Sequence, residues 1–303
     1  MNLLRCITVI FLSSLIIGCA RDRGELGTAQ NPVKLFFVPS VDAKVIANRS
    51  KEIQAYLEAN TPYKFKVSTP PSYIAVVESF GTRRADVAAL NTFGYILAHE
   101  KYNAEARLTV LRYGRGTYRS QVIARADSSI EKVEDLAGKK FAYVDAASTS
   151  GYLLPRKMFK DHGIVPAETT FAGTHDNVVS MVYQRQVDAG ATFHSPVEDG
   201  KIQDARRLVK TQYPDVEDVI HIVQLTDEIP NDPIVFRKEL SEEMKESITA
   251  AFLSYLDTEE GRTTFHHLYG VTAMRRSTDA DYAGVREMIE TLGTSADALM
   301  QKE

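Results

Sequence analysis

Three consecutive hydroxyl residues, Ser148, Thr149 and Ser150, are well suited to hold a negatively charged group. They lie between an apolar run that predicts a buried strand over 141–144 and a stretch that predicts a helix over 151–162. A turn from strand to helix presents unpaired N–H groups and the positive end of the helix dipole. Ser150 is expected both to cap this helix and to donate to an anion. The segment predicts an oxyanion site, although Ser and Thr at a helix start can also be simple caps.

Regular helical pairing after this turn is expected to start late or to kink, because Pro155 cannot donate a helical hydrogen bond. Elsewhere, apolar β-rich runs alternate with amphipathic helical stretches, a pattern typical of βαβ units in an α/β fold. Ser72 is a predicted helix cap. The predicted strands are 33–38, 64–68, 85–90, 108–113, 119–124, 141–144 and 219–224, and the predicted helices are 44–60, 72–82, 151–162, 177–185 and 242–257.

The N-terminus has the pattern of a bacterial lipoprotein export signal. Arg5 supplies a positive charge, residues 7–17 are mostly apolar, and Ile16-Ile17-Gly18-Cys19 resembles a lipobox. The apolar run is short for a membrane span, which disfavours the alternative of an uncleaved anchor. The sequence therefore predicts a signal peptide over 1–18, a lipid on Cys19, a flexible tether over 19–31 and a location on the extracytoplasmic face of the cell envelope.

Composition argues against several other classes of function. The formal net charge is -4, so nucleic acid and anionic membrane surfaces are poor partners beyond the lipid itself. Cys6 and Cys19 are the only cysteines, which leaves the folded part without a disulfide or a thiolate metal site. His266 and His267 are consecutive and point in different directions on a helix, so a metal role is disfavoured. No cofactor is expected.

Several motifs, taken in order, carry a family resemblance. They are Ser148-Thr149-Ser150-Gly151 with Pro155, Thr174-His175-Asp176-Asn177, Val187-Asp188-Ala189-Gly190-Ala191, Ile229-Pro230-Asn231-Asp232-Pro233-Ile234-Val235 and Thr278-Asp279-Ala280-Asp281-Tyr282. Over residues 33–288 the chain resembles the phosphate, phosphite and phosphonate-binding family of ABC transporter substrate-binding lipoproteins. The resemblance implies a type II periplasmic binding fold, with two mixed sheets flanked by helices and joined by two crossover strands. Lobe 1 would comprise 32–122 and 225–303, and lobe 2 would comprise 123–224.

The resemblance also implies a set of ligand-binding residues in the cleft between the lobes. Without it, the tyrosines could be ordinary half-buried aromatics, His175 and Asp176 a capping pair, and Asp232 a turn residue. Ionised Asp232 can only accept hydrogen bonds, so it would favour a ligand that carries a P–O–H group and would penalise sulfate. The implied residues are Tyr73, Tyr118, Ser148, Thr149, Ser150, His175 and Asp232.

The identity of the ligand stays open at this level. Members that take aminoalkyl phosphonates are expected to bind the amine with a glutamate, and this chain has His194-Ser195-Pro196 at that place, with Glu198 further on. Phosphate, phosphite, a small phosphonate and arsenate all remain candidates. The protein is expected to be a monomer that serves an ABC permease or, as the alternative, a sensor kinase. A hydrolase built from Ser148 or Ser150 with His175 and Asp176 is disfavoured, because a Gly-x-Ser-x-Gly elbow is missing.

Overall fold

The structure is a computed structural model that describes residues 24–291. Its first sheet has six strands in the order β11-β4-β10-β3-β1-β2. β1 is parallel to β2 and β3, whereas β10 is antiparallel to both β3 and β4, so the sheet is mixed. These strands are β1 (Val33–Phe37), β2 (Phe65–Ser68), β3 (Val87–Ala89), β4 (Glu105–Leu111), β10 (Pro233–Phe236) and β11 (Ala273–Arg276).

The second sheet has five strands in the order β7-β6-β8-β5-β9. β6 is parallel to β7 and β8, and β5 is antiparallel to β8 and β9, so this sheet is mixed as well. The two mixed sheets confirm the predicted fold class. The strands are β5 (Thr117–Arg125), β6 (Lys140–Tyr143), β7 (Glu168–Phe171), β8 (Ala189–His194) and β9 (Ile220–Pro230).

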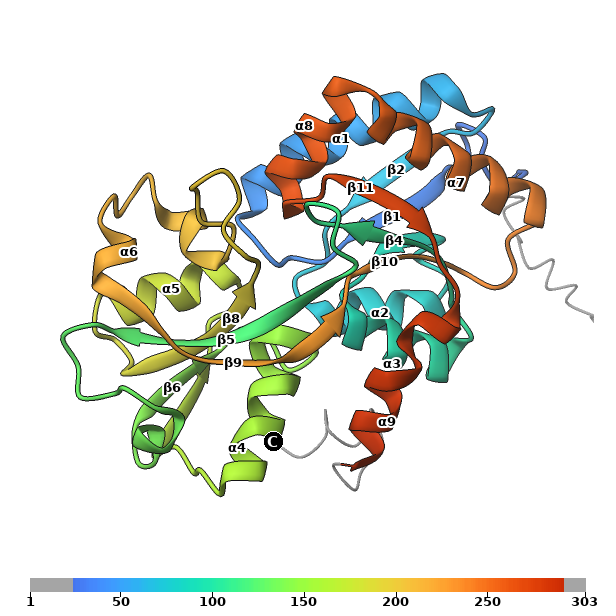
Figure 1. The fold of residues 1–303 in the computed structure, drawn as a ribbon. Helices are drawn as coiled ribbons and strands as arrows, with labels where there is room; N and C mark the ends of the chain where they lie inside the picture. Colours follow the sequence, from blue (N-terminus) through green and yellow to red (C-terminus); the bar gives the residue numbers. More distant parts are fainter. Residues whose placement is uncertain (1–23, 292–303) are drawn as a thin grey trace, which may run out of the picture.

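Helices cover both faces of each sheet (Figure 1). Around the six-stranded sheet lie α1 (Ala43–Asn60), α2 (Tyr73–Gly81), α3 (Thr92–Tyr102), α7 (Glu242–Asp257), α8 (Glu259–Tyr269) and α9 (Ala283–Thr291). Around the five-stranded sheet lie α4 (Leu154–His162), α5 (His175–Tyr183) and α6 (Val216–Val219). Short 3-10 turns are formed by Val133–Leu136, Ala205–Val209 and Asp279–Tyr282, and a π-helical turn by Thr149–Leu153.

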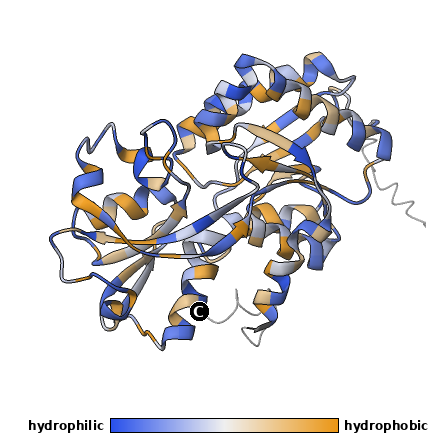
Figure 2. Ribbon diagram, viewed as in Figure 1, coloured by the Kyte–Doolittle hydropathy of each residue, from blue (hydrophilic) through white to orange (hydrophobic). Residues whose placement is uncertain are grey.

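Alternation along the strands explains the layers. Val87 and Ala89 of β3 pack in the core beneath α1, α7 and α8, whereas Ala88 packs in the core with α2 and α3. Successive side chains of a strand point to opposite faces, so β3, which is covered on both faces, has apolar residues at every position. Figure 2 shows the matching pattern, with hydrophilic residues on the outward sides of the helices.

The chain passes from one sheet to the other twice, at 112–116 between β4 and β5 and at 231–232 between β9 and β10. β5 and β9 run side by side as a long antiparallel pair toward the six-stranded lobe (Figure 1). The lobe boundaries expected at 122/123 and 224/225 fall inside these two strands, all of whose pairing is in the five-stranded sheet. The change of sheet therefore occurs at the two short connections.

Local sequence signals account for several of the helices. Ser72 caps α2, because its hydroxyl accepts a hydrogen bond from the Ala75 N–H, and α7 spans the range expected for it. α3 was not expected, because its residues from Thr92 to Ala98 are all buried and lack amphipathic periodicity. α8 was expected only as a helix that carries His266 and His267, without bounds, although its Thr258 cap, two acidic residues in the first turn and Gly270 at the C-cap are helix signals.

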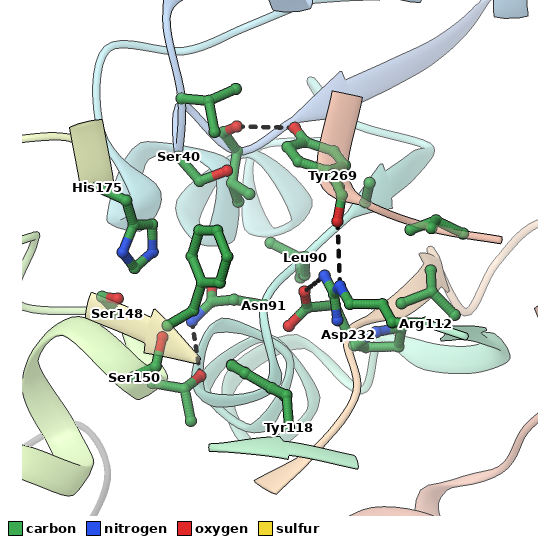
Figure 3. A pocket seen from close by; sticks show the side chains of 18 of the residues that line it. Ser40, Leu90, Asn91, Arg112, Tyr118, Ser148, Ser150, His175, Asp232 and Tyr269 are labelled. Carbon is green, nitrogen blue, oxygen red and sulfur yellow. Dashed lines mark hydrogen bonds and ion pairs between the residues drawn. The ribbon is translucent and has the colours of Figure 1, made fainter. Parts of the chain in front are cut away.

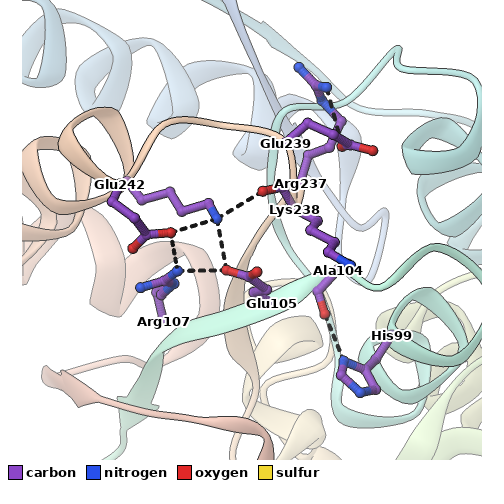
Figure 4. Close-up of polar contacts among 9 residues, drawn as sticks. His99, Ala104, Glu105, Arg107, Arg237, Lys238, Glu239 and Glu242 are labelled. Atoms are coloured by element: carbon purple, nitrogen blue, oxygen red, sulfur yellow. Dashed lines mark hydrogen bonds and ion pairs between the residues drawn. The ribbon is translucent and has the colours of Figure 1, made fainter.

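A charged network fixes α7 to the start of β4 in the six-stranded sheet (Figure 4). The Lys245 ammonium donates to Glu105, Glu242 and the Lys238 carbonyl oxygen at 2.9 to 3.0 Å, and its side chain is only 2% exposed. The Arg107 guanidinium donates to the same two carboxylates. Buried Lys245 and half-buried Arg107 thus share two carboxylates, so both charges are compensated and the network has a structural role.

The described N-terminal residues, 24–31, form turns against the six-stranded lobe. The Gly27 carbonyl oxygen accepts a hydrogen bond of 2.7 Å from the Lys64 N–H, and Leu26 packs on the core. These residues belong to the segment for which the sequence predicts a tether. Cys19 and the signal segment lie outside the described residues. Within 24–291, no helix is both long and apolar enough to cross a membrane.

Candidate functional site

A cavity of about 70 Å³ lies between the two lobes and is lined from both sides (Figure 3). The described structure brings all seven residues expected at the site to the wall of this one cavity. They are Tyr73, Tyr118, Ser148, Thr149, Ser150, His175 and Asp232. Other polar residues line the same cavity and were not predicted from the sequence, namely Ser40, Asn91, Arg112, Arg207 and Tyr269.

The hydroxyl segment lies at the turn between β6 and α4, as the sequence predicts. Residues Thr149–Leu153 form a single π-helical turn, and α-helical pairing starts only at Leu154, with Pro155 in the first turn. The expected late start of the helix is therefore confirmed. The N–H groups of Thr149 and Ser150 have no acceptor within the described chain. Unpaired N–H groups at a helix start attract anions.

The three hydroxyls have different local partners. The Ser148 hydroxyl accepts the Gly151 N–H at 3.1 Å and is the cap of the turn, so the expectation that Ser150 caps it is wrong. The Thr149 hydroxyl accepts from the Asn91 side-chain amide at 3.0 Å and from the Phe93 N–H at 2.8 Å, which ties the turn to the start of α3 in the other lobe. This leaves the hydroxyl of Ser150 as the one without a capping or interlobe acceptor role.

Two tyrosines, one from each lobe, add donors. Tyr73 begins α2, and its buried phenol oxygen has no hydrogen-bond partner in the structure described. Tyr118 lies on β5, and the Arg112 guanidinium is 5.4 Å from its ring centroid. Burial raises the pKa of both phenols, so both stay protonated and can donate. The Tyr73 N–H also donates to Asp145 across the cleft at 3.4 Å.

His175 is the first residue of α5, behind the cap Thr174. Burial, with a smaller contribution from the positive charge of Arg112, lowers the pKa of its imidazole to about 3. The ring is therefore neutral at pH 7 and does not donate as an imidazolium. Its Nδ1 is buried and has no partner in the described part of the chain. The His175 N–H donates to the Ser40 carbonyl oxygen at 3.2 Å, which connects the lobes on this side of the cavity.

Asp232 faces the hydroxyl segment from the second connection between the sheets. Its Oδ2 accepts from Arg112 Nη2 at 2.7 Å, while its Oδ1 is buried without a partner in the described structure. Arg112 is itself held by the Tyr269 carbonyl oxygen and by Asn231 Oδ1, at 3.0 and 2.8 Å. The carboxylate is thus fixed by a cation on one oxygen and is free to accept on the other.

The geometry does not support a hydrolase. A serine nucleophile needs a histidine that is oriented by an acid. Neither His175 Nδ1 nor Asp176 Oδ1 has a hydrogen-bond partner among the described residues, so Asp176 does not orient the imidazole. A metal role has no support either, because no cluster of three or more His, Cys, Asp or Glu residues occurs within 24–291. His266 Nε2 instead lies 2.6 Å from the Tyr113 hydroxyl.

Comparison with known proteins agrees with this architecture. Residues 35–282 match the family model described as ABC transporter, phosphonate, periplasmic substrate-binding protein. The chain is 28% identical to the phosphate-import protein PhnD of Mycolicibacterium smegmatis, over 90% of each chain. It is 27% identical to the phosphonates-binding periplasmic protein of Escherichia coli, over 77% of this chain and 68% of that one.

Among solved structures, the fold is similar to the binding-protein component of a phosphonate ABC transporter from Pseudomonas aeruginosa. The TM-score is 0.76 and the identity 21%, and 89% of each chain is covered. The match confirms the type II periplasmic binding fold. The family model covers most of the sequence, and it describes binding proteins, not enzymes. The chain belongs to the family of periplasmic substrate-binding proteins of phosphonate ABC transporters.

Proposed function

We propose that the protein captures a small, singly protonated phosphorus oxyanion in the interlobe cavity and delivers it to the permease of an ABC importer. The candidates are hydrogen phosphate, phosphite and small phosphonates. The names of the two relatives, one for phosphate import and one for phosphonate binding, support this class. An importer is favoured over a sensory role because the matching family model describes ABC transporter components.

The free Oδ1 of Asp232 is the observation that carries this proposal. Hydroxyl and N–H donors supply one side of the cavity, and Asp232 supplies a buried acceptor that has no partner of its own. Donors suit the charged oxygens of a phosphonate, and the acceptor suits its P–O–H group. Sulfate has no proton at neutral pH, so its oxygens would face the carboxylate and leave Oδ1 unpaired.

The dimensions of the cavity support a small ligand. Its volume is about 70 Å³, whereas one enclosed water needs about 10–15 Å³. The cavity therefore has room for roughly five to seven groups of the size of a water molecule. Phosphate, phosphite and methylphosphonate fit this range, whereas a nucleotide would require the lobes to separate.

Contacts across the cleft support a closing motion of the two lobes around the ligand. The Tyr73 N–H donates a hydrogen bond to the Asp145 carboxylate, and the His175 N–H donates to the Ser40 carbonyl oxygen. The Asn91 side-chain amide donates to the Thr149 hydroxyl. All three pairs connect residues of the six-stranded lobe to the five-stranded lobe. The two short connections between the sheets are the places where such a rotation would be absorbed.

Isothermal titration of the mature chain tests the proposal directly. Phosphate, phosphite, methylphosphonate, arsenate and sulfate are titrated separately at pH 7. At least one phosphorus oxyanion should bind at least about a hundredfold more tightly than sulfate, because an unpaired buried charge costs on the order of 2–5 kcal/mol. Equal affinities for sulfate and the best phosphorus ligand would refute the role of Asp232.

The membrane anchor is a separate part of the proposal. A lipid on Cys19 would hold the binding protein near its permease through the segment that precedes residue 24. Cys19→Ser should move the protein from the membrane fraction to the soluble fraction without changing its melting temperature. A mutant that stays with the membranes would instead favour an uncleaved N-terminal helix.

A further inference from the structure

The charges on the cavity wall are unbalanced. Among its described lining residues are two guanidinium groups, those of Arg112 and Arg207, and one carboxylate, that of Asp232. Arg112 pairs with Asp232 at 2.7 Å. Arg207 has no carboxylate within ion-pair distance in the structure described, and its Nε is buried without a hydrogen-bond acceptor. With His175 neutral, the wall therefore carries one positive charge that no protein group offsets.

Arg207 reaches the cavity from the five-stranded lobe. It lies in the 3-10 turn Ala205–Val209 and extends to the end of α8 in the other lobe. Its Nη2 would be 3.2 Å from a Cβ placed on Gly270, the residue that ends α8 and follows Tyr269. Tyr269 and Arg112 lie on the side of the cavity away from Ser148 and Ser150 (Figure 3). Arg207 therefore joins the wall at the end remote from the hydroxyl segment.

A partly buried cation without an acceptor is costly, and an anion delivered by a ligand removes that cost. Burial lowers the pKa of Arg207, and the neighbouring Arg112 acts in the same direction, while Tyr113 and Asp204 oppose the shift. Burial and Arg112 both favour the arrival of a negative group at this place. An ammonium group on the ligand would be repelled, since it would find two guanidinium groups and a carboxylate whose Oδ2 is paired with Arg112 and whose Oδ1 is taken by the P–O–H group of the same ligand.

We propose that Arg207 binds a second acidic group on the ligand, so that the preferred substrates are small phosphonates that also carry a carboxylate. The inference rests on the proposed function, because the phosphonate group occupies the donors around Ser150 and Asp232. The carboxylate then extends toward Gly270 and accepts a bidentate pair of hydrogen bonds from the guanidinium group. Aminoalkyl phosphonates are disfavoured by the same charge.

Titration with three probes of similar size tests this selectivity. Phosphonoacetate, methylphosphonate and 2-aminoethylphosphonate are compared on the wild-type chain and on Arg207→Gln. The wild type should bind phosphonoacetate at least about tenfold more tightly than methylphosphonate, and 2-aminoethylphosphonate most weakly. Arg207→Gln should weaken phosphonoacetate by roughly ten- to hundredfold and leave methylphosphonate within about threefold, because only one charge-assisted contact is lost.

Arg115→Gln is the matched control. Arg115, in the connection between β4 and β5, forms an exposed ion pair of 3.3 Å with Glu198 and does not line the cavity. Arg115→Gln removes a guanidinium ion pair outside the cavity, so the preference for phosphonoacetate over methylphosphonate should persist. Arg207→Glu is a second variant, and it should reverse the preference toward 2-aminoethylphosphonate.

The outcomes separate the two proposals. A wild type that binds methylphosphonate as tightly as phosphonoacetate overturns the role of Arg207 and leaves the proposed function intact. The same holds if Arg207→Gln weakens both ligands equally. A wild type that binds no phosphorus oxyanion at all overturns the proposed function, and the inference falls with it. The wild-type comparison needs no variant, so it decides even if Arg207→Gln fails to fold.

Discussion

The two walls of the cavity are built in opposite ways. The hydroxyl wall is a single contiguous segment, Ser148 to Ser150, and it offers donors from one turn. The opposite wall combines Arg112, Asp232 and Tyr269, whose contacts join residues 119, 120 and 157 positions apart in the chain. This wall offers one free acceptor, Asp232 Oδ1, and the guanidinium group of Arg112, which donates to three acceptors.

The difference shows how binding strength and selectivity can be divided. Donors from a turn bind any oxyanion of suitable size, because every oxyanion accepts hydrogen bonds. An acceptor with no partner discriminates among oxyanions, because only a protonated ligand satisfies it. The hydroxyl wall should therefore set the affinity, and the Asp232 wall should set the choice between phosphorus ligands and sulfate.

Asp232→Asn should have the largest effect on that division. The amide cannot act as a full carboxylate acceptor and leaves Arg112 without its counter-ion, so methylphosphonate affinity should fall at least about a hundredfold. Sulfate should lose much less, so the ratio of the two affinities should shrink. Asp227→Asn, at an exposed position on β9, is the control and should change neither affinity. An unaltered ratio in Asp232→Asn would assign the discrimination to another group.

Ser150→Ala should come next and should affect the ligands alike. The variant removes one hydrogen bond to a charged oxygen, which is worth roughly 1.5–3 kcal/mol, or about ten- to hundredfold in dissociation constant. Titration with methylphosphonate and with sulfate measures both losses. If Ser150→Ala alters the ratio instead of both affinities, the proposed division between the two walls is wrong.

The same contrast explains what the sequence could predict. The strand-to-helix turn is a local signal, and its unpaired N–H groups and delayed helix follow from the apolar run at 141–144, the three hydroxyl residues and Pro155. Arg112 has no such signal, because it lies in the connection between β4 and β5 and gains its partners only through folding. The family resemblance identified Asp232, but it did not identify Arg112, which holds the Asp232 carboxylate in place. The neutral state of His175 also depends on burial, which one sequence does not display.

Elements follow the same rule. Amphipathic α1 and α7 were predicted nearly to the residue, whereas α3 is buried on all sides and lacks the periodicity that marks a helix. The assignment of the cap to Ser150 failed because Ser148 is the residue in the extended conformation before the turn. Which of several neighbouring hydroxyls caps a helix depends on the backbone conformation of each residue, which the sequence alone does not give.

His175 gives a pH test that involves neither ligand nor selectivity. Its pKa is about 3 in the folded protein and about 6.5 in an unfolded chain, so its contribution to stability is complete above pH 6.5 and is lost as the pH falls toward 3. Relative to His175→Asn, the free energy of unfolding of the wild type should fall by up to about 1.4 kcal/mol per pH unit in that window.

Denaturant unfolding of ligand-free protein at pH 7, 6, 5 and 4.5 measures this slope. His267→Asn, at an exposed histidine on α8, is the control and should follow the wild type. Parallel curves for the wild type and His175→Asn would mean that the imidazole is solvated enough to be charged. His175 would then belong to the donors of the hydroxyl wall as an imidazolium.

Ser148→Ala should have the smallest effect and should separate capping from binding within the hydroxyl wall. Its hydroxyl accepts the Gly151 N–H, so its loss should cost about 1 kcal/mol of stability. Ser150→Ala should show the opposite pattern, with nearly unchanged melting in the absence of ligand. Ligand at about a hundred times the wild-type dissociation constant stabilises the wild type by about 2.7 kcal/mol, and Ser148→Ala should gain nearly as much while Ser150→Ala gains clearly less. If the two variants exchange these behaviours, the cap and the ligand contact have been assigned to the wrong serines, and the anion lies two residues nearer to β6 than the geometry indicates.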